Sequence, residues 1–490
     1  MTAPARRSAL LAALLLPLAL ACAGAPPSSG PPAGPAAAPS PAAAPDGDAS
    51  APGPGAPAPG PGGAPVPRPP PPTVTLTARE AAVADAVDRL APEAIGFLER
   101  VVNVNSGTMN HAGVREVGRL FGERLAALGL DTTWVPMPVE VNRAGHLFAE
   151  RRGGDGPTIL LIGHLDTVFE RHDPFQRYEE PGDGTARGPG VADMKGGNVV
   201  ILLALEALQA AGALDGMNVI VALTGDEEET GKPLTIARAP LLAAARRSDA
   251  ALGFEGGVGG RNSATVARRG FTEWRVETTA PGGHSSGIFG ARAGAGAAFE
   301  AARILNAFYT KLRGEEHLTF GAGILLGGTQ VEYDPETDRG TAFGKTNVIP
   351  VRVVMAGDLR TLTTAQLERA KRRMRRIVDD HLPHAGAEIE FRDSYPPMAP
   401  APGNLALLSV LDGVSRDLGL GPVQAVDPGR RGAADISFAA QHAPALGGLG
   451  VVGSGAHSPR ETVDLASIPV MAKRTALLLL RLSRDGVPAP

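Results

Sequence analysis

Short apolar runs that end at polar clusters constrain the fold of this chain more than any other feature. Four such runs cover residues 157–162, 218–223, 250–254 and 449–452, and each lies next to turn residues, as buried strands do. A helical stretch over residues 194–211 lies between two of them. This alternation predicts an α/β fold, with a mostly parallel sheet and helices on both of its faces.

Polar clusters stand where the strands should end. Ligands bind beyond the carboxyl ends of parallel strands, so residues far apart in sequence can meet along one edge of the sheet. A single histidine or acidic run has ordinary explanations, such as a solvated turn. Together, however, the clusters offer two imidazoles and several carboxylates, which suit zinc or a similar ion and exceed one tetrahedral site. We therefore expect a hydrolase with two metal ions. The clusters contain His164 and Asp166, Asp193, the acidic run 226–229, Glu255, and His457.

The first 22 residues are predicted to be a signal peptide, because two arginines precede an apolar segment and a small-residue cleavage site. Cys22 follows that site directly and is the only cysteine, which excludes an intrachain disulfide and cysteine-ligated metal. Its position resembles a bacterial lipobox, although the residues before it depart from the usual order. We expect an exported protein, periplasmic or anchored at the membrane by a lipid on Cys22. Simple secretion, with the cysteine lost or unmodified, is the alternative.

Residues 23–77 are dominated by Ala, Pro, Gly and Ser, a composition that cannot bury enough apolar surface to fold. They are predicted to form a disordered tether. The formal net charge of -4 favours neither nucleic acid nor an anionic membrane as the main partner. The hydrophobic content of 43% is ample for the core of a folded part.

About two hundred residues separate Glu255 from His457, far more than a loop between neighbouring strands needs. This interval has its own β-α-β-β-α-β pattern, which is the ferredoxin-like order. We therefore expect an inserted domain over residues 264–397, between catalytic segments over 78–263 and 398–490. Its elements are strand 271–278, helix 294–312, strands near 324–333 and 348–359, helix 364–381 and strand 387–393.

With these residues in view, the chain resembles the M20 zinc peptidase family, which includes acetylornithine deacetylases, succinyl-diaminopimelate desuccinylases, aminoacylases and glutamate carboxypeptidases. The resemblance runs from about residue 80 to 485 and is strongest for the glutamate carboxypeptidase branch. Four motifs match the family signatures in order, and their ordered series is far more specific than any one of them. They are Gly-His164-Leu-Asp166-Thr-Val, Gly-Pro-Gly-Val-Ala-Asp193-Met-Lys-Gly, Thr-Gly-Asp226-Glu227-Glu228 and Gly-Ala-His457-Ser.

The resemblance implies two zinc ions per subunit, with Co²⁺ or Mn²⁺ as substitutes. Asp193 would bridge both ions; His164 and Glu255 would complete one site, and Glu228 and His457 the other. Glu227 would be the general base. Asp166 would orient the ring of His164, a task that metal-bound histidines generally need filled. The resemblance also implies a cis peptide bond between Asp193 and Met194.

Three features of the inserted domain resemble family segments. His284, in Pro-Gly-Gly-His-Ser-Ser, resembles a lid histidine that reaches the neighbouring subunit's metal site and stabilises an oxyanion, which implies a homodimer formed through this domain. Asn347 and Arg360 resemble residues that hold the substrate's terminal carboxylate, for which a planar guanidinium is well suited. Without the family, each of the three has an ordinary reading as a turn or surface residue. Asp435, in a further family-like segment, either organises the loop of His457 or caps a helix.

The expected function is hydrolysis of the amide bond next to a free terminal carboxylate, in a peptide or an N-acyl amino acid. The alternative is removal of an acetyl or succinyl group from a small metabolite. A remote alternative is an inactive protein that captures peptides in the same pocket, although every catalytic position is occupied.

Overall fold

The structure is a computed structural model that describes residues 76–489. The predicted signal peptide, Cys22 and nearly all of the predicted tether lie outside the described residues. Across residues 76–489, no helix combines the length and apolar character that crossing a bilayer would require.

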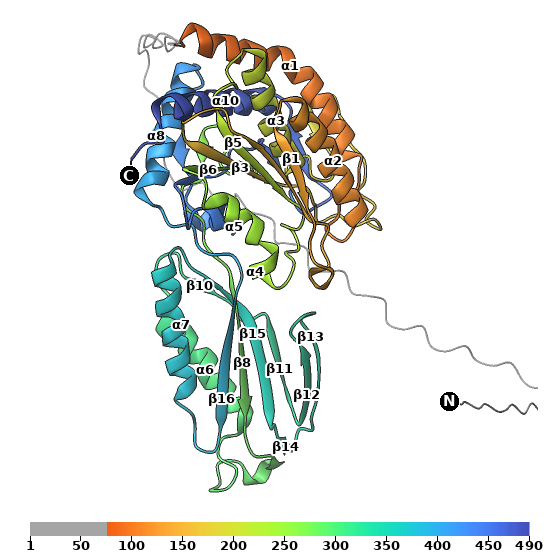
Figure 1. Ribbon diagram of the computed structural model, residues 1–490. Helices are drawn as coiled ribbons and strands as arrows, with labels where there is room; N and C mark the ends of the chain where they lie inside the picture. Colours follow the sequence, from red (N-terminus) through yellow and green to blue (C-terminus); the bar gives the residue numbers. More distant parts are fainter. Residues whose placement is uncertain (1–75, 490) are drawn as a thin grey trace, which may run out of the picture. The chain divides into compact units, whose positions relative to one another are not determined.

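A six-stranded sheet carries the candidate site, with strand order β1-β2-β5-β3-β6-β18 (Figure 1). Its β3–β5, β3–β6 and β6–β18 pairs are parallel, which confirms the mostly parallel α/β sheet. At one edge β2 pairs antiparallel with both β1 and β5, and neither β1 nor β2 was predicted. The strands are β1 (Asp131–Val135), β2 (His146–Arg151), β3 (Thr158–His164), β5 (Asn218–Thr224), β6 (Ala250–Gly253) and β18 (Ala445–Leu446).

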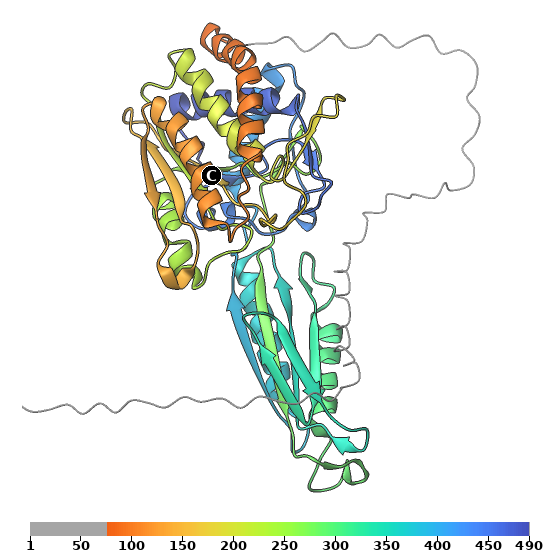
Figure 2. The same ribbon diagram turned by 90° about the vertical axis from the view of Figure 1, so that its right-hand side faces the viewer.

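Helices cover both faces of this sheet because successive strand residues point to opposite sides. In β3, Ile159 and Leu161 belong to the larger core, whereas Leu160 and Ile162 belong to the smaller one. Both views show α1, α2, α3 and α10 gathered on one side (Figures 1 and 2). The larger core is built with α1 (Ala78–Val102), α2 (His111–Ala127), α3 (Lys195–Ala210), α8 (Pro402–Asp417) and α10 (Ser467–Asp485), the smaller with α5 (Ala239–Ala245), α9 (Ile436–Ala439) and the short α4 (Leu234–Ala237).

The strand predicted over residues 449–452 is wrong. This segment is an irregular loop, and the strand that extends the sheet is β18, a few residues earlier. Gly450 accounts for the loop, because a Cβ there would lie 2.1 Å from the carbonyl oxygen of Phe254. Leu449 and Val451 are buried where this loop packs against the end of β6, and the run belongs to no strand.

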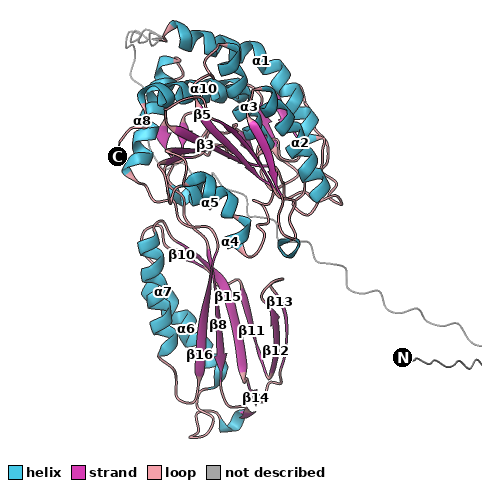
Figure 3. Ribbon diagram, viewed as in Figure 1, coloured by secondary structure: helices cyan, strands magenta, loops and turns pink. Residues whose placement is uncertain are grey.

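A second, antiparallel sheet follows the expected β-α-β-β-α-β order, with β8 and β15 at its centre (Figure 3). Helices α6 and α7 supply a separate core with Trp274, Val276 and Met355. The elements are β8 (Thr272–Thr279), α6 (Gly296–Leu312), β10 (Thr319–Phe320), β11 (Ile324–Gly328), β15 (Arg352–Arg360), α7 (Thr364–Asp379) and β16 (Gly386–Asp393).

The second and third strands of the predicted order were each expected to be one long strand. The structure interrupts both of them. The run 324–333 divides into β11 and β12 (Gln330–Asp334), and β12 forms a hairpin with β13 (Arg339–Phe343). The break falls at Gly328, where a Cβ would lie 2.3 Å from the carbonyl oxygen of Phe343. The run 348–359 divides into β14 (Val348–Ile349) and β15 around Pro350, which has no backbone N–H for a strand ladder.

The remaining short elements hold loops together. β19 (Gly453–Ser454), β20 (Thr462–Asp464) and β4 (Thr185–Arg187) form a three-stranded sheet that brings the loop of His457 to the loop before Asp193. The others are β7 (Ser263–Ala264), β9 (Gly283–His284), β17 (Gln424–Ala425) and the 3₁₀ turns η1 (Val139–Val141), η2 (Ser285–Gly287) and η3 (Pro428–Arg430).

Candidate metal centre

His164 is the last residue of β3 and is almost fully buried. Its Nδ1 lies 3.1 Å from the carbonyl oxygen of Asp166 and 3.4 Å from that residue's Oδ1. Its Nε2 lies 3.3 Å from Oδ1 of Asp193. Asp166 therefore lies against one ring nitrogen of His164, and the other ring nitrogen faces Asp193.

Asp193 stands between the two histidines. Its Oδ1 faces His164, and its Oδ2 lies 3.1 Å from Nε2 of His457. The same nitrogen of His457 is 3.0 Å from Oε2 of Glu228. Hydrogen bonds to Asp193 and Glu228 raise the pKa of His457 to about 11. Each carboxylate oxygen of Asp193 thus has its own histidine, which is the arrangement expected of a bridging ligand.

Asp166 also anchors the acidic loop that follows β5. Its two carboxylate oxygens accept hydrogen bonds from the backbone N–H groups of Glu227 (3.0 Å) and Glu228 (3.1 Å). The hydroxyl of Thr108 donates a third, at 2.6 Å. Burial would raise the pKa of Asp166, but its hydrogen bond with His164 and these donors hold the pKa below its ordinary value. One buried carboxylate therefore positions both a histidine and the loop opposite it.

Carboxylates crowd this site. Ligand atoms of His164, Glu227 and Glu255 lie within 4.8 Å of one another, and so do those of His164, Asp193 and Glu228. Burial raises the pKa of Glu228 to about 7, and burial together with the charge of Glu255 raises that of Glu227 well above its usual range. Oε1 of Glu228 is buried without a hydrogen-bond partner among the described residues. Crowded carboxylates, two imidazoles and an unpartnered buried oxygen are a donor set that fits divalent cations.

Two buried arginines beside Glu255 were not foreseen. Arg268 and Arg431 place Nη2 atoms 3.4 and 3.7 Å from Oε2 of Glu255. Arg431 also lines a cavity of about 160 Å³ together with Asp193, Glu255 and Ser454. Burial lowers the pKa of Arg431 to about 10, so it keeps its charge at neutral pH. Neither arginine stands in a recognisable motif, so the sequence offered no signal for them.

Glu461 is a second unforeseen residue, and it shapes the loop of Asp193. Its carboxylate accepts hydrogen bonds from the backbone N–H groups of Gly190, Ala192 and Asp193, at 3.1, 2.9 and 2.9 Å. The peptide bond between Asp193 and Met194 is cis, which confirms that prediction. Glu461 lies four residues after His457. The loop that carries His457 therefore also holds the backbone of Asp193.

Asp435 does neither of the two things proposed for it. It makes no side-chain cap hydrogen bond at the start of α9, and no contact joins it to the loop of His457 in the described residues. Its oxygens instead accept hydrogen bonds from Nε of Arg238 (2.8 Å) and from the hydroxyl of Thr224 (2.6 Å). Asp435 therefore belongs to a buried ionic network beneath the acidic loop.

The structure brings His284 and Asn347 together, but away from the five candidate ligands. The N–H of Ser285 donates to the carbonyl oxygen of Asn347 at 2.9 Å, and His284 pairs with Val348. This corner follows the end of β8, an eight-residue strand that spans about 27 Å. Arg268, which contacts Glu255, precedes the opposite end of the same strand.

Arg360 lies nearer to the candidate site. Its Nε is 2.8 Å from Oδ2 of Asp358, and its guanidinium stacks over Phe271 at 4.9 Å. Its Nη1 lies 3.9 Å from the position that a Cβ on Gly432 would occupy. Arg360 thus reaches the loop that carries Arg431.

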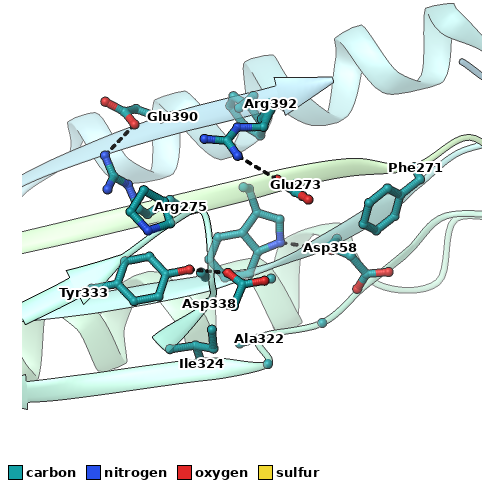
Figure 4. A pocket seen from close by; sticks show the side chains of 17 residues that line it. Phe271, Glu273, Arg275, Ala322, Ile324, Tyr333, Asp338, Asp358, Glu390 and Arg392 are labelled. Atoms are coloured by element: carbon teal, nitrogen blue, oxygen red, sulfur yellow. Dashed lines mark hydrogen bonds and ion pairs between the residues drawn. The ribbon is translucent and has the colours of Figure 1, made fainter. Parts of the chain in front are cut away.

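A larger cavity of about 700 Å³ lies elsewhere, on the second sheet (Figure 4). Several polar side chains that line it have partners: Arg275 lies 2.6 Å from Glu390, and the hydroxyl of Tyr333 donates to Asp338 at 2.6 Å. None of the five candidate ligands lines it. Its size therefore does not make it the catalytic pocket.

An α/β sheet whose strand ends gather histidines and carboxylates defines a metal-dependent hydrolase. The chain belongs to peptidase family M20/M25/M40, whose family model matches residues 160–481. It is an enzyme of the metallopeptidase type, which hydrolyses amide bonds.

Among curated proteins, carboxypeptidase G2 of Pseudomonas sp. (strain RS-16) is 26% identical over 82% of this chain and 92% of its own length. Succinyl-diaminopimelate desuccinylase of Leptothrix cholodnii is 36% identical, but the match covers only 27% of this chain and 36% of that relative. Among solved structures, aminopeptidase PepT of Bacillus cereus has a TM-score of 0.63 at 18% identity, covering 80% of this chain and 98% of its own. A dinuclear metal-binding peptidase of Bacillus subtilis has a TM-score of 0.59 at 15% identity, covering 81% and 99%. Both structures share the fold.

Proposed function

We propose that this protein is an exported dinuclear zinc exopeptidase that hydrolyses the amide bond next to a free terminal carboxylate. The observation that supports this most is the position of Asp193, whose two oxygens face His164 and His457 separately. A carboxylate placed in this way would be shared by two divalent ions. Glu255 would complete the site of His164, and Glu228 that of His457.

The protein's own groups have distinct tasks in this proposal. Bound zinc ions would make a water nucleophilic near neutral pH and polarise the scissile carbonyl. Glu227 accepts a proton from the attacking water and delivers it to the leaving nitrogen as the C–N bond breaks. Asp166 accepts a hydrogen bond from the backbone N–H of Glu227, which limits the directions that the carboxylate of Glu227 can take. Arg360 and Asn347 would hold the substrate's terminal carboxylate.

The protein would act as a homodimer formed through the second sheet and its helices. Support for this comes from the corner of His284, which follows the far end of β8 from Arg268 and Glu255. A histidine placed there would serve the active site of another subunit that approaches it. We propose that His284 stabilises the oxyanion in the neighbouring subunit's site.

A deacylase of N-acetyl or N-succinyl amino acids is the second candidate. The local 36% identity to a succinyl-diaminopimelate desuccinylase supports it. The 26% identity to a carboxypeptidase extends over 82% of this chain, which favours the exopeptidase.

One experiment separates these candidates. Zinc-loaded protein is incubated with dipeptides, N-acyl amino acids, N-succinyl amino acids and the matching amides that lack the terminal carboxylate, and products are identified by mass spectrometry. We expect a free amino acid from carboxylate-bearing dipeptides and N-acyl amino acids, no product from the amides, and two zinc ions per chain by elemental analysis. Turnover of N-acetyl or N-succinyl amino acids without any hydrolysis of dipeptides would favour the deacylase. Binding without turnover would indicate a peptide-capturing protein.

Export is proposed from the amino-terminal residues. Labelling with a radioactive fatty acid in a bacterial host tests it: we expect a labelled protein in the membrane fraction, and no label in a Cys22→Ala variant. A processed, unlabelled protein in the medium would favour simple secretion.

A further inference from the structure

Tyr395 lies two residues after β16, on the segment that leaves the second sheet. Its ring packs against Phe438 of α9, with centroids 5.1 Å apart. Its hydroxyl donates a hydrogen bond to the carbonyl oxygen of Glu227, at 3.2 Å. The return segment of the second sheet is thus joined directly to the residue proposed as the general base.

The hydroxyl of Tyr395 has its full set of partners. Because its single proton points to Glu227, the oxygen can accept two hydrogen bonds. One comes from Nη2 of Arg238 at 3.1 Å, and the hydroxyl of Thr230 lies 2.8 Å away, where either oxygen can be the donor. The Thr230 hydroxyl also lies 3.4 Å from the carbonyl oxygen of Glu227. Three polar groups therefore surround the hydroxyl of Tyr395, and two of them, Thr230 and the carbonyl of Glu227, belong to the acidic loop and the residues that follow it.

Arg238 connects this hydroxyl to the start of the loop. Its side chain is fully buried, and Nη1 and Nη2 donate to Oδ1 and the carbonyl oxygen of Asp226, at 2.5 and 3.2 Å. Asp435 neutralises the same guanidinium through Nε, at 2.8 Å. The backbone of Glu227 is therefore anchored at both of its polar groups. Its N–H donates to Asp166, and its carbonyl oxygen accepts a hydrogen bond from Tyr395.

We propose that Tyr395 is a positioning residue for Glu227, acting through the backbone carbonyl and tying the acidic loop to the second sheet. The inference rests on the proposed function, because it assigns the base to Glu227. A proton acceptor must lie within hydrogen-bond reach of the water it activates, and a displacement of about 1 Å can cost roughly 100-fold in rate. Removing the hydroxyl of Tyr395, which makes the shorter of the two hydrogen bonds to the carbonyl oxygen of Glu227, should therefore lower turnover without changing which substrate binds.

The test removes only the hydroxyl, in Tyr395→Phe, and keeps the ring that packs against Phe438. On a substrate that the wild-type protein hydrolyses, we expect kcat to fall about 10-fold and KM to change less than about 3-fold. Tyr333→Phe is the matched control, since it removes a hydroxyl that donates to Asp338 within the β12–β13 hairpin. It should leave kcat unchanged. Unchanged kcat in Tyr395→Phe, with zinc content confirmed, would overturn the proposal.

Two further measurements exclude a general loss of structure. In a Glu227→Gln background, Tyr395→Phe should cause no additional loss of the residual activity, because a residue that acts through Glu227 has nothing left to position. An equal loss in both backgrounds would contradict the proposal.

Amide hydrogen exchange over residues 226–231 of the metal-free protein gives a readout independent of activity. Exchange should quicken in Tyr395→Phe and stay unchanged in Tyr333→Phe. If the wild-type protein hydrolyses no substrate in the panel, the proposed function is wrong. The exchange result still decides whether Tyr395 holds the acidic loop. Unchanged exchange in Tyr395→Phe would overturn that link.

Discussion

At the scale of single residues, two adjacent carboxylates have different surroundings. Glu228 lies 3.0 Å from His457, whereas Glu227 groups with His164 and Glu255. Their backbone N–H groups bind separate oxygens of Asp166. Neighbouring residues on an irregular loop can therefore serve separately as a ligand and as a base.

Replacement of Glu227 tests this division. Glu227→Ala should retain its zinc and lose activity by roughly 10²- to 10⁴-fold, because a general base is lost while the ligands remain. Metal content and kcat are measured on the same preparation. Glu229→Ala is the matched control, since this exposed neighbour pairs with Arg143 and its loss should leave activity near normal. Near-normal turnover in the Glu227 variant would eliminate it as the base.

At the scale of elements, α3 approaches the end of β6 so closely that only glycine fits. A Cβ on Gly197 would lie 2.0 Å from the carbonyl oxygen of Phe254, the residue before Glu255. Gly96, in the interior of α1, has no atom within 4 Å of the corresponding position and is exposed. The two helical glycines therefore have opposite packing requirements.

The same substitution should have opposite effects at these glycines. Gly197→Ala should destabilise the protein by about 1–3 kcal/mol, because the methyl group forces α3 away from β6. Gly96→Ala should stabilise it by about 0.4–1 kcal/mol, because alanine loses less backbone entropy on folding. Denaturant unfolding of both variants measures the difference. A stability gain in Gly197→Ala would show that the contact with Phe254 relaxes without cost.

At the scale of the whole molecule, the metal centre joins segments from both halves of the chain. Five carboxylates converge there: Asp166, Asp193, Glu227, Glu228 and Glu255. Without cations they repel one another, and their burial adds to the cost. The centre should therefore contribute to stability as well as to catalysis.

Metal removal should lower the thermal midpoint. A ligand at about 100 times its Kd stabilises a folded protein by about 2.7 kcal/mol, so chelation should reduce Tm by several degrees and zinc should restore it. Calorimetry with and without a chelator checks this. A Tm that does not respond to zinc would contradict metal binding by the folded protein.

Subunit mixing tests the homodimer. His284→Ala and Glu227→Ala proteins should each be inactive alone, and mixed dimers should regain one active site, which combines an intact Glu227 with an intact His284 from the other subunit. Activity after verified subunit exchange is the measurement. If no activity returns, His284 does not act across an interface.

Much of the fold and the site was open to prediction because strand periodicity and motif order are local properties. The runs before His164 and Glu255 became β3 and β6, and the five candidate ligands gather where those strands end. The prediction of a strand over residues 449–452 was wrong, because apolar composition does not distinguish a strand from a buried loop packed against Phe254.

Other features were decided by the tertiary structure alone. Arg238 meets Asp435, nearly two hundred residues later, because α4 and α5 lie on the same face of the sheet as α9. Tyr395 meets Glu227 because the segment leaving the second sheet passes beside the acidic loop. The sequence by itself predicted which residues carry the chemistry, from their types after apolar runs and from the family motifs that they match. The side chains that hold these residues in place come from segments far apart in the sequence. Which segments meet is decided by the packing of the folded chain.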